Sequence, residues 1–358
     1  MLKFVRGLCA AVAAAALLAV AAPACAQAPA TPTPDNPWVT LAPFPEPFED
    51  LLGATAGGKL YVFGGLAPGW RPKALVFEYD PANDTWSKKK PMPLGAHRFA
   101  LASHGDRIYA FGGFKYPESG AAAWEPVNNA WEYDPASDSW KALAPMPSKR
   151  GAAAAAVVQG KIYVIGGAGA MPGAGDAAMV PTRRHMTVGT VEEYDPKTDS
   201  WHTRAALPTP RNHPAAATVN NRIYVIGGRI GSAFALRGSN TDIVEAYDPG
   251  SDSWGVPLER MPTPRSAAGW GIWKNLIVIA GGENQEGGAL AGFRAVEAYD
   301  PARNQWKAMP TMPHPRRGLA AGVIGDRFYA VSGEPQPAAG GTPSAAPAAQ
   351  ALQLDLVK

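Results

Sequence analysis

The sequence predicts an all-β fold made from a repeated unit of four short antiparallel strands. Its 358 residues include 39 Gly and 36 Pro, about a fifth of the chain, which indicates many turns and few long helices. Hydrophobic residues make up 46%, enough for a large core. One short motif containing Tyr, Asp, Pro and Trp returns five times along the chain. Such self-similarity is typical of repeat architectures.

The repeated motif is Tyr-Asp-Pro followed by four residues and a Trp. A Gly-Gly doublet precedes each copy, and Ser332-Gly333 is a sixth, degenerate doublet. The copies are YDPANDTW (79–86), YDPASDSW (133–140), YDPKTDSW (194–201), YDPGSDSW (247–254) and YDPARNQW (299–306).

Each unit can be divided into four strands. A small apolar run such as AAAAAVV (152–158) forms the first, and a two-residue turn such as Asn220-Asn221 leads to the second, of the type KIYVIGG (161–167). The doublet marks places where a neighbouring backbone or ring comes too close for a Cβ. The third strand ends at Tyr-Asp-Pro, and the fourth begins at the Trp.

Four antiparallel strands repeated about every 50 residues are the pattern of a β-propeller. The doublets, the Tyr-Asp-Pro turns and the Trp together resemble Kelch repeats over nearly the whole mature chain. A lone fourth strand from Trp38 to Ala42 begins the repeats, and three strands without a fourth end them, the last at 351–357. We therefore predict a six-bladed Kelch propeller over residues 38–358, closed by its N-terminal strand, which removes the exposed sheet edges.

Residues 1–26 resemble a secretory signal peptide. Lys3 and Arg6 precede an apolar run over 8–22, and Ala24-Cys25-Ala26 provides a cleavage site. The run of about 15 residues is shorter than the roughly 20 needed to span a bilayer. We expect an exported protein, periplasmic or secreted, with a Pro-rich linker at 27–37 and no cysteine after cleavage.

The predicted strand order places the long connections between second and third strands on one face, together with the connections between blades. Loops that vary on a constant scaffold are where binding usually occurs. The long connections are 67–73, 114–128, 168–189, 229–240, 283–293 and 334–348.

An arginine follows the exit from most fourth strands on this face. One interpretation is a cationic rim that binds carboxylates. The other is structural, because a residue repeated in every blade can serve the scaffold. Arg229 lies outside the repeat and is a separate ligand candidate, whereas the first blade carries Glu49 and Asp50 instead. The repeated candidates are Arg98, Arg150, Arg211, Arg265 and Arg316, with Arg317 next to the last.

Catalytic motifs are scarce. The six histidines show no metal-ligand spacing, and the Kelch-type copper-radical oxidases need a cysteine that the mature chain lacks. Glu283, directly after a doublet, and Arg294, just before a third strand, loosely resemble the Glu-Arg pair of bacterial sialic-acid mutarotases. That resemblance implies a carboxylate that shuttles the anomeric proton and an arginine that holds the substrate. The alternative is a solvated loop glutamate beside a surface arginine.

These observations favour a binding module for a glycan, peptide or protein at the loop-rich face. A mutarotase of the N-acetylneuraminate type is the alternative. The net charge of +3 indicates neither nucleic-acid nor membrane-surface binding. We expect no cofactor, no metal, no membrane span and a monomer.

Overall fold

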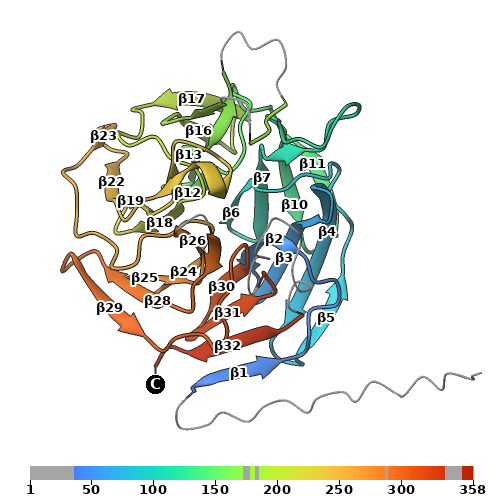
Figure 1. Cartoon of the computed structure of the whole chain (residues 1–358), viewed down its shortest axis with the longest axis vertical. Coiled ribbons are helices and arrows are strands. Elements are labelled where there is room, and N and C mark those ends of the chain that lie inside the picture. The colour runs from blue at the N-terminus through green and yellow to red at the C-terminus, as the bar shows by residue number, and fades with distance from the viewer. Residues whose placement is uncertain (1–35, 172–177, 182–184, 287–288, 335–348, 358) are drawn as a thin grey trace, which may run out of the picture.

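The computed structural model describes residues 36–171, 178–181, 185–286, 289–334 and 349–357. It confirms a ring of six blades around a central channel, each blade a sheet of four antiparallel strands (Figure 1). The predicted signal peptide and all but the last two residues of the predicted linker lie outside the described residues.

The first three blades follow one another along the chain, each running from the channel outward. Their strands are β2 (Glu49–Ala56), β3 (Lys59–Ala67), β4 (Arg71–Asp80) and β5 (Thr85–Lys88); β6 (Ala100–His104), β7 (Arg107–Phe111), β10 (Ala130–Asp134) and β11 (Ser139–Ala142); and β12 (Ala154–Val158), β13 (Lys161–Ile165), β16 (Val191–Asp195) and β17 (Ser200–Arg204).

The last three blades repeat this order, except that the sixth takes its outermost strand from the start of the chain. Their strands are β18 (Ala215–Val219), β19 (Arg222–Ile226), β22 (Val244–Asp248) and β23 (Ser253–Trp254); β24 (Gly269–Trp273), β25 (Leu276–Ala280), β28 (Val296–Asp300) and β29 (Gln305–Met309); and β30 (Ala320–Ile324), β31 (Arg327–Val331), β32 (Ala351–Asp355) and β1 (Trp38–Leu41).

The ring closes as the sequence predicts. β1 pairs antiparallel with β32, with Trp38 opposite Leu354 and Leu41 opposite Ala351. The indole of Trp38 is 3% exposed and donates to the carbonyl of Pro310 at 3.0 Å. In Figure 1 the blue N-terminal strand lies beside the red C-terminal one. No blade of the described ring is left with three strands.

The repeated motif joins neighbouring blades. In the third blade, the hydroxyl of Tyr194 donates to Asp199 at 2.7 Å, and Asp199 also accepts the backbone N–H of Ala144 from the blade before at 2.8 Å. The indole of Trp201 donates to the carbonyl of the same Ala144 at 2.8 Å. Equivalent bonds recur in the first, second, fourth and fifth blades, with Asn304 in place of the aspartate in the fifth. These side chains of the motif therefore connect one blade to the next.

The Gly-Gly doublets stand where the next blade's backbone passes closely, as predicted. Gly166 and Gly167 have φ of 67° and 105°, values that L side chains rarely adopt. A Cβ on Gly166 would lie 2.5 Å from the carbonyl oxygen of Arg211. The N–H of Gly167 donates to that same oxygen at 2.9 Å.

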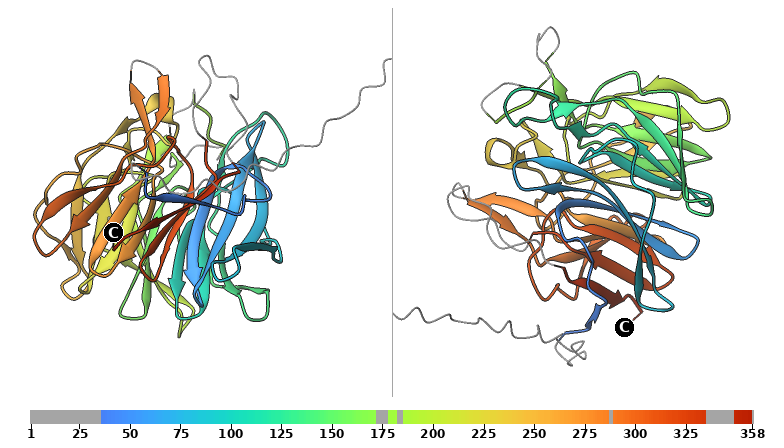
Figure 2. Two further views of the ribbon diagram at one scale, coloured as in Figure 1. Left: turned by 90° about the horizontal axis from the view of Figure 1, so that it is seen from below. Right: turned by 90° about the vertical axis from the view of Figure 1, so that its right-hand side faces the viewer.

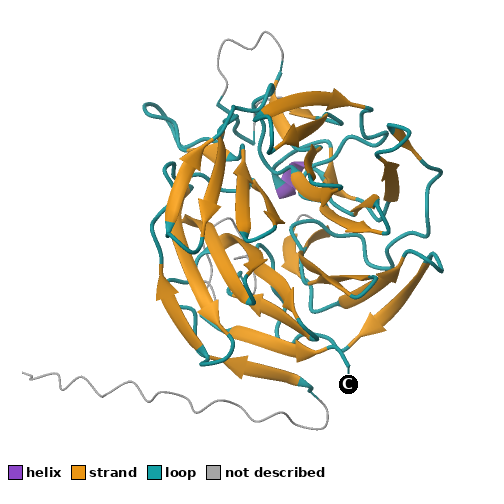
Figure 3. Cartoon of the chain, turned by 180° about the vertical axis from the view of Figure 1, so that it is seen from behind, coloured by secondary structure: helices purple, strands orange, loops and turns teal. Residues whose placement is uncertain are grey.

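The connections between second and third strands contain pairing that the sequence did not predict. Four carry short hairpins, and the first is shorter than expected, because β3 runs to Ala67 and β4 begins at Arg71. Figure 2 (left) shows the orange hairpin β26–β27 standing out from one face, and Figure 3 shows the short helical turn near the axis of the ring. The additional elements are β8 (Phe114–Lys115), β9 (Glu125–Pro126), β14 (Ala168–Ala170), β15 (His185–Thr187), β20 (Arg229–Ile230), η1 (Ala235–Arg237), β21 (Ser239–Asn240), β26 (Glu283–Glu286) and β27 (Ala289–Gly292).

Candidate functional site

Four of the repeated arginines lie inside the blades. Arg211, for example, pairs with Glu245 on β22 and donates to the carbonyl of Val225 on β19 at 3.0 Å. Such a buried pair fixes strands in place, and the geometry favours the structural interpretation of the series. The others follow the same plan: Arg150 with Glu192, Arg265 with Glu297, and Arg316 with the carbonyl of Ser332 and the side chain of Gln350. All four are at most 1% exposed.

Arg98 does not belong to this series, contrary to the grouping made from the sequence. Arg150 immediately precedes Gly151, which bridges to the residue after the doublet, whereas in the second blade the bridging residue is His97. Ala96 therefore occupies the position of Arg150, and Arg98 lies two positions further on. The exits differ in composition from blade to blade. Grouping every arginine that follows an exit therefore gave the wrong register for Arg98.

Six equivalent residues, one per blade, surround the channel in a left-handed conformation. Their φ values lie between 52° and 57°. Their backbones are linked from blade to blade, as where Ala152 donates to the carbonyl of Arg98 at 2.6 Å and His213 to that of Ala152 at 2.8 Å. The six residues are Asp50, Arg98, Ala152, His213, Ala267 and Gly318.

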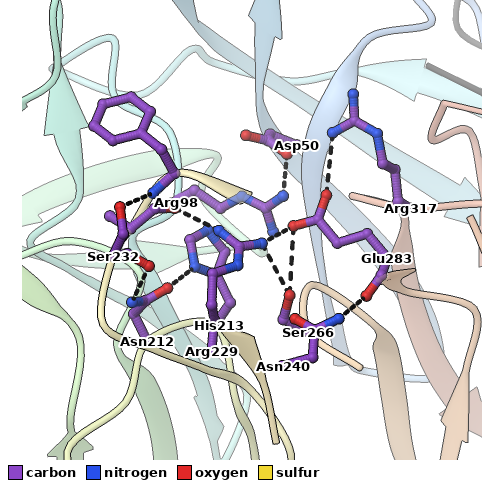
Figure 4. A network of polar contacts seen from close by, with 12 residues as sticks. Asp50, Arg98, Asn212, His213, Arg229, Ser232, Asn240, Ser266, Glu283 and Arg317 are labelled. Carbon is purple, nitrogen blue, oxygen red and sulfur yellow. Dashed lines mark hydrogen bonds and ion pairs between the residues drawn. The ribbon is translucent and has the colours of Figure 1, made fainter. Parts of the chain in front are cut away.

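Charged side chains gather at the end of the channel that these six left-handed residues surround. They come from the left-handed positions themselves, from the residues just before them, and from the residues that follow the doublets. We call them the mouth network, and Figure 4 shows the part of it around Arg98, Arg229 and Glu283. It combines carboxylates and guanidinium groups from every blade except the third. Its members, most of them buried, are Glu49, Asp50, His97, Arg98, His213, Arg229, Glu283, Arg317 and Glu334.

Glu283 is the centre of one half of the mouth network. Its carboxylate, on a residue 3% exposed, pairs with Arg229 and accepts from Arg317 at 3.3 Å. Its backbone carbonyl accepts from Asn240 at 2.5 Å, and Arg229 also donates to Ser266 at 2.9 Å. Three blades are thus joined through one carboxylate.

Arg317 connects Glu283 to the sixth and first blades. Its guanidinium also pairs with Glu334 and, at 3.0 Å, with Glu49. The side chain of Glu49 is 27% exposed. Burial and the neighbouring Asp50 carboxylate raise the pKa of Glu49 to about 7, although Arg317 and Arg98 oppose the shift. Glu49 therefore exchanges a proton close to neutral pH.

Asp50 is the centre of the other half. It pairs with Arg98, and its second oxygen lies 3.3 Å from His97 Nδ1. Burial alone would raise the pKa of Asp50, but Arg98 and His97 outweigh it and hold the pKa well below its ordinary value. Burial lowers the pKa of His97. The Asp50–Arg98 pair is therefore charged and His97 neutral.

His213 faces two positive charges. Its Nδ1 contacts the side-chain oxygen of Asn212, whose amide nitrogen donates to the carbonyl of Ser232 at 3.0 Å. Burial, followed by the charges of Arg98 and Arg229, holds the pKa of His213 well below its ordinary value. The imidazole is neutral and lies in a region of positive potential.

Loop aromatic residues from the first, second and fourth blades stack on one another. We call Trp70, Phe114, Trp124 and Phe234 the aromatic cap. Trp124 and Phe234 stack at 4.2 Å between ring centroids, and Phe114 and Trp124 at 5.3 Å. Trp70 is half-buried, packs on Phe234 at 5.6 Å and has a strained φ of 61°. The backbone of Trp124 also bonds to Met179 of the third blade at 2.8 Å.

Glu283 and Arg294 have different neighbours. Glu283 is held by Arg229 and Arg317, as described above. Arg294 is exposed, and its Nε donates to the backbone carbonyl of Met312 at 2.6 Å. The structure brings together Arg98, Arg229 and Glu283 of the predicted site residues, and it separates them from the repeated arginines.

Sequence reasoning missed the roles of Asp50, His97, His213 and Trp70. A usable signal existed for the first three, because they occupy the two repeat positions that precede the innermost strands, where the third blade carries Gly151 and Ala152. Charged or polar residues at positions that a neighbouring blade fills with glycine and alanine indicate a site. The partner of Trp70, Phe234, lies three blades further along the chain, so no local pattern reveals the cap.

The described residues offer neither a metal centre nor a membrane-spanning helix. They contain no group of three or more His, Cys, Asp or Glu side chains placed to hold a metal ion. Among them, too, no helix has the length and apolar character needed to cross a membrane.

Comparisons with known proteins agree with this architecture. At 29% identity, the chain is similar to the Kelch-like protein terF of Aspergillus terreus over 82% of its own length and 63% of that protein's. It is 28% identical to Kelch-like protein 36 of Rattus norvegicus and 27% identical to Kelch-like protein 23 of Homo sapiens, covering 44% and 45% of them. The chain thus spans roughly half the length of these relatives.

Fold similarity extends to a solved structure, that of YjhT. The TM-score is 0.69 at 17% identity, over 87% of this chain and 95% of the other. The sequence matches the KLHDC2/KLHL20/DRC7 Kelch-repeats domain over residues 40–205 and the Kelch motif over 210–254 and 264–313. With the repeat, the six blades and these matches in agreement, the chain belongs to the Kelch-repeat family of β-propellers.

Proposed function

We propose that this chain is an exported binding module that recognises a glycan, peptide or protein with its loop-rich face. Kelch propellers are a family of interaction modules, and this chain's relatives share the propeller rather than their whole length. The observation that carries the proposal is the construction of this face. Connections from three blades pack into one aromatic cap, and the mouth network lies at the same end of the channel.

The aromatic cap supplies the large, rigid contact surface that binding sites use. Aromatic residues contribute much of the energy at interfaces, and a half-buried Trp70 leaves part of its ring for a partner. Its left-handed backbone is maintained by stacking on Trp124 and Phe234. Strain held at a loop tip supports a functional role for this residue.

Glycan and peptide arrays test the binding proposal. We expect the mature protein to bind a defined set of ligands, and Trp70→Ala to weaken that binding by about 10-fold or more, as a lost aromatic contact does. A matched control is Trp273→Ala, which removes an indole at the opposite, short-turn face. Equal loss in both variants, or none in Trp70→Ala, contradicts the assignment to the loop-rich face.

Export is tested by cell fractionation and by mass spectrometry of the purified protein. Cleavage after Ala26 predicts a mature chain that begins at Gln27 and contains no cysteine. A protein that is found in the cytoplasm with residues 1–26 still attached contradicts this part of the proposal.

A mutarotase of the N-acetylneuraminate type is the second candidate. Glu49 supports it, because a carboxyl with a pKa near 7 is suited to proton transfer and lies 3.0 Å from Arg317. Proton NMR of N-acetylneuraminate anomers measures the activity directly. If this candidate is correct, the wild type accelerates anomer exchange and Glu49→Gln loses that acceleration. Arg294→Ala tests the other pair, Glu283 and Arg294, which the sequence suggested. No acceleration by the wild type removes the enzyme and leaves the binding module.

A further inference from the structure

A groove opens between the first and second blades on the loop-rich side of the molecule. Its volume of about 440 Å³ is within the usual range for sites that bind small molecules. The start of β4 contributes one wall, and β8 of the second blade, which lies beside it, begins the other. Three of the lining side chains are basic and one is acidic.

The two basic residues of β4 point to the same side of the strand. Arg71 and Lys73 are two positions apart, and both are exposed. On the other wall Lys115 pairs with Glu118 and Glu125 at 3.4 and 3.5 Å, whereas the two cations of β4 have no ion pair with any other described residue. The groove therefore presents two positive charges without a carboxylate partner.

Aromatic rings hold both of these cations in place. The guanidinium carbon of Arg71 lies 4.7 Å from the ring centre of Tyr116, and the ammonium of Lys73 lies 5.3 Å from that of Phe48. A guanidinium stacked on a ring keeps its in-plane N–H groups free for a carboxylate. Because the side chain is already oriented, it loses less conformational freedom when it binds an anion.

The edge of β4 beside this groove is already paired. The carbonyl of Ala74 accepts from the N–H of Met92 at 2.8 Å, and that of Val76 accepts from the N–H of Lys89 at 2.9 Å. Pro72 has no N–H to offer. An extended peptide would therefore find no strand edge to pair with, which favours a compact anion that side chains alone recognise.

The remaining walls of the groove suit a sugar ring. Pro72, Leu94 and Gly95 supply a small apolar surface. The half-buried Tyr116 adds a phenolic hydroxyl that can donate or accept a hydrogen bond. A sugar carries both C–H faces and hydroxyl groups, so this mixture of apolar and polar groups matches its chemistry.

We propose that this groove binds a hexuronate residue of an acidic glycan. Arg71 and Lys73 donate to the sugar carboxylate, and the apolar surface contacts one face of the ring. The inference rests on the binding function proposed above and narrows its ligand to acidic glycans. Trp70 directly precedes Arg71, so the aromatic cap and the groove share one loop.

Calorimetric titration of the mature protein with methyl β-glucuronide tests the groove, with methyl β-glucoside as a probe that keeps the ring and lacks the carboxylate. We expect the glucuronide to bind at least about 10-fold more tightly at low salt, and most of this advantage to disappear at about 1 M NaCl, where exposed charges are screened. Equal affinity for the two sugars overturns the charged contact. No binding of the glucuronide at millimolar concentration overturns the proposal.

The glycan and peptide arrays separate this failure from that of the proposed function. If the glucuronide does not bind but the arrays detect other ligands, only the acidic glycan is wrong. If the arrays detect none, the binding function fails as well. Hexaglutamate that competes more strongly than an oligogalacturonate of the same length would assign the groove to acidic peptides and overturn the glycan.

Two variants locate the site. Arg71→Gln and Lys73→Gln should each weaken glucuronide binding by about 3- to 10-fold and leave glucoside binding the same. The matched control is Lys307→Gln, which removes the same charge from an exposed position on β29 of the fifth blade and should change neither. Because all three side chains are exposed, the variants should melt at the wild-type temperature. Unchanged glucuronide binding in the double variant Arg71→Gln, Lys73→Gln places the sugar elsewhere and overturns the proposal.

Discussion

The two faces of the propeller use the same strands for different purposes. On the short-turn face, five blades repeat the same contacts, as where Asp199 accepts from Tyr194 and from the N–H of Ala144 in the blade before, and Trp201 donates to the Ala144 carbonyl. On the loop-rich face, by contrast, the left-handed position of the repeat is occupied by different residues, including Asp50, Arg98, Ala152 and His213. Their side chains make different contacts. Periodic residues therefore identify the scaffold, and departures from the period identify the candidate site.

The same comparison applies to the arginines. Arg150, Arg211, Arg265 and Arg316 recur at one position and are buried in equivalent ways. Arg98, Arg229 and Arg317 differ in position, and each pairs with a different carboxylate or set of carboxylates. Repetition of a charged residue in a propeller is thus an argument for structure. The predictions that follow test this division from the largest expected effect to the smallest.

Removing residues 27–45 should have the largest effect. It deletes β1 and the buried Trp38, and it exposes the edge of β32. Burial of one large side chain alone contributes about 1.5–3 kcal/mol, so the loss together with the strand should reach several kcal/mol. Guanidinium-induced unfolding measures it. A control deletion of 27–35 keeps Asn36, which accepts the N–H of Trp38, and should change nothing. Equal stability of both truncated chains contradicts ring closure.

Arg211→Met should lower the free energy of unfolding by about 3–5 kcal/mol, because it leaves Glu245 buried without its partner. The double variant Arg211→Met, Glu245→Met should recover much of the loss, since both charges are then absent. Urea unfolding of the single and double variants gives the coupling. A single variant with wild-type stability but weaker ligand binding would restore the repeated arginines as ligand candidates.

Much of the scaffold could be predicted from the sequence, because its determinants recur. Each copy of Tyr-Asp-Pro and Trp makes the same bonds, so the copies reveal the blade, its boundaries and its closure by Trp38. The candidate site could be predicted only in part. Glu283 stood out because it follows a doublet, and Arg229 because it lies outside the repeat, but their pairing depends on side chains that meet from different blades. Arg98 was misplaced because the exits vary in sequence.

Glu49→Gln tests the loop-rich face through pH. Burial and Asp50 raise the pKa of Glu49 from 4.5 to about 7 against the effect of Arg317, with Arg98 and Glu283 as its other charged neighbours. The folded protein then holds the proton more tightly than the unfolded chain does. Stability from this group is full below a pH of about 4.5 and is lost as pH rises toward 7.

The loss should approach about 3 kcal/mol above pH 7, since one pKa unit corresponds to about 1.4 kcal/mol. Glu49→Gln removes the titration, so the variant should equal the wild type near pH 4.5 and exceed it in stability at a pH of about 8. Thermal unfolding across this range measures the difference. Parallel pH profiles of the two proteins would show that Glu49 titrates normally and is unsuited to proton transfer near neutrality.

Asp199→Asn should have the smallest effect, although Asp199 lies in the repeated motif. Its side-chain oxygen accepts from Tyr194 at 2.7 Å and from the N–H of Ala144 at 2.8 Å. Asn304 makes the equivalent two bonds in the fifth blade at 2.7 and 2.8 Å, and asparagine tolerates the φ of 50° at this turn. We expect a loss below about 0.5 kcal/mol for Asp199→Asn, but about 2 kcal/mol for Asp199→Ala, which removes the oxygen that accepts both bonds. Chemical denaturation separates the two.

The same two variants also test which face binds ligands. Because the short-turn face serves the scaffold, neither variant should alter ligand binding at the loop-rich face once folded. A change in binding without a change in stability would mean that the short-turn face also carries function.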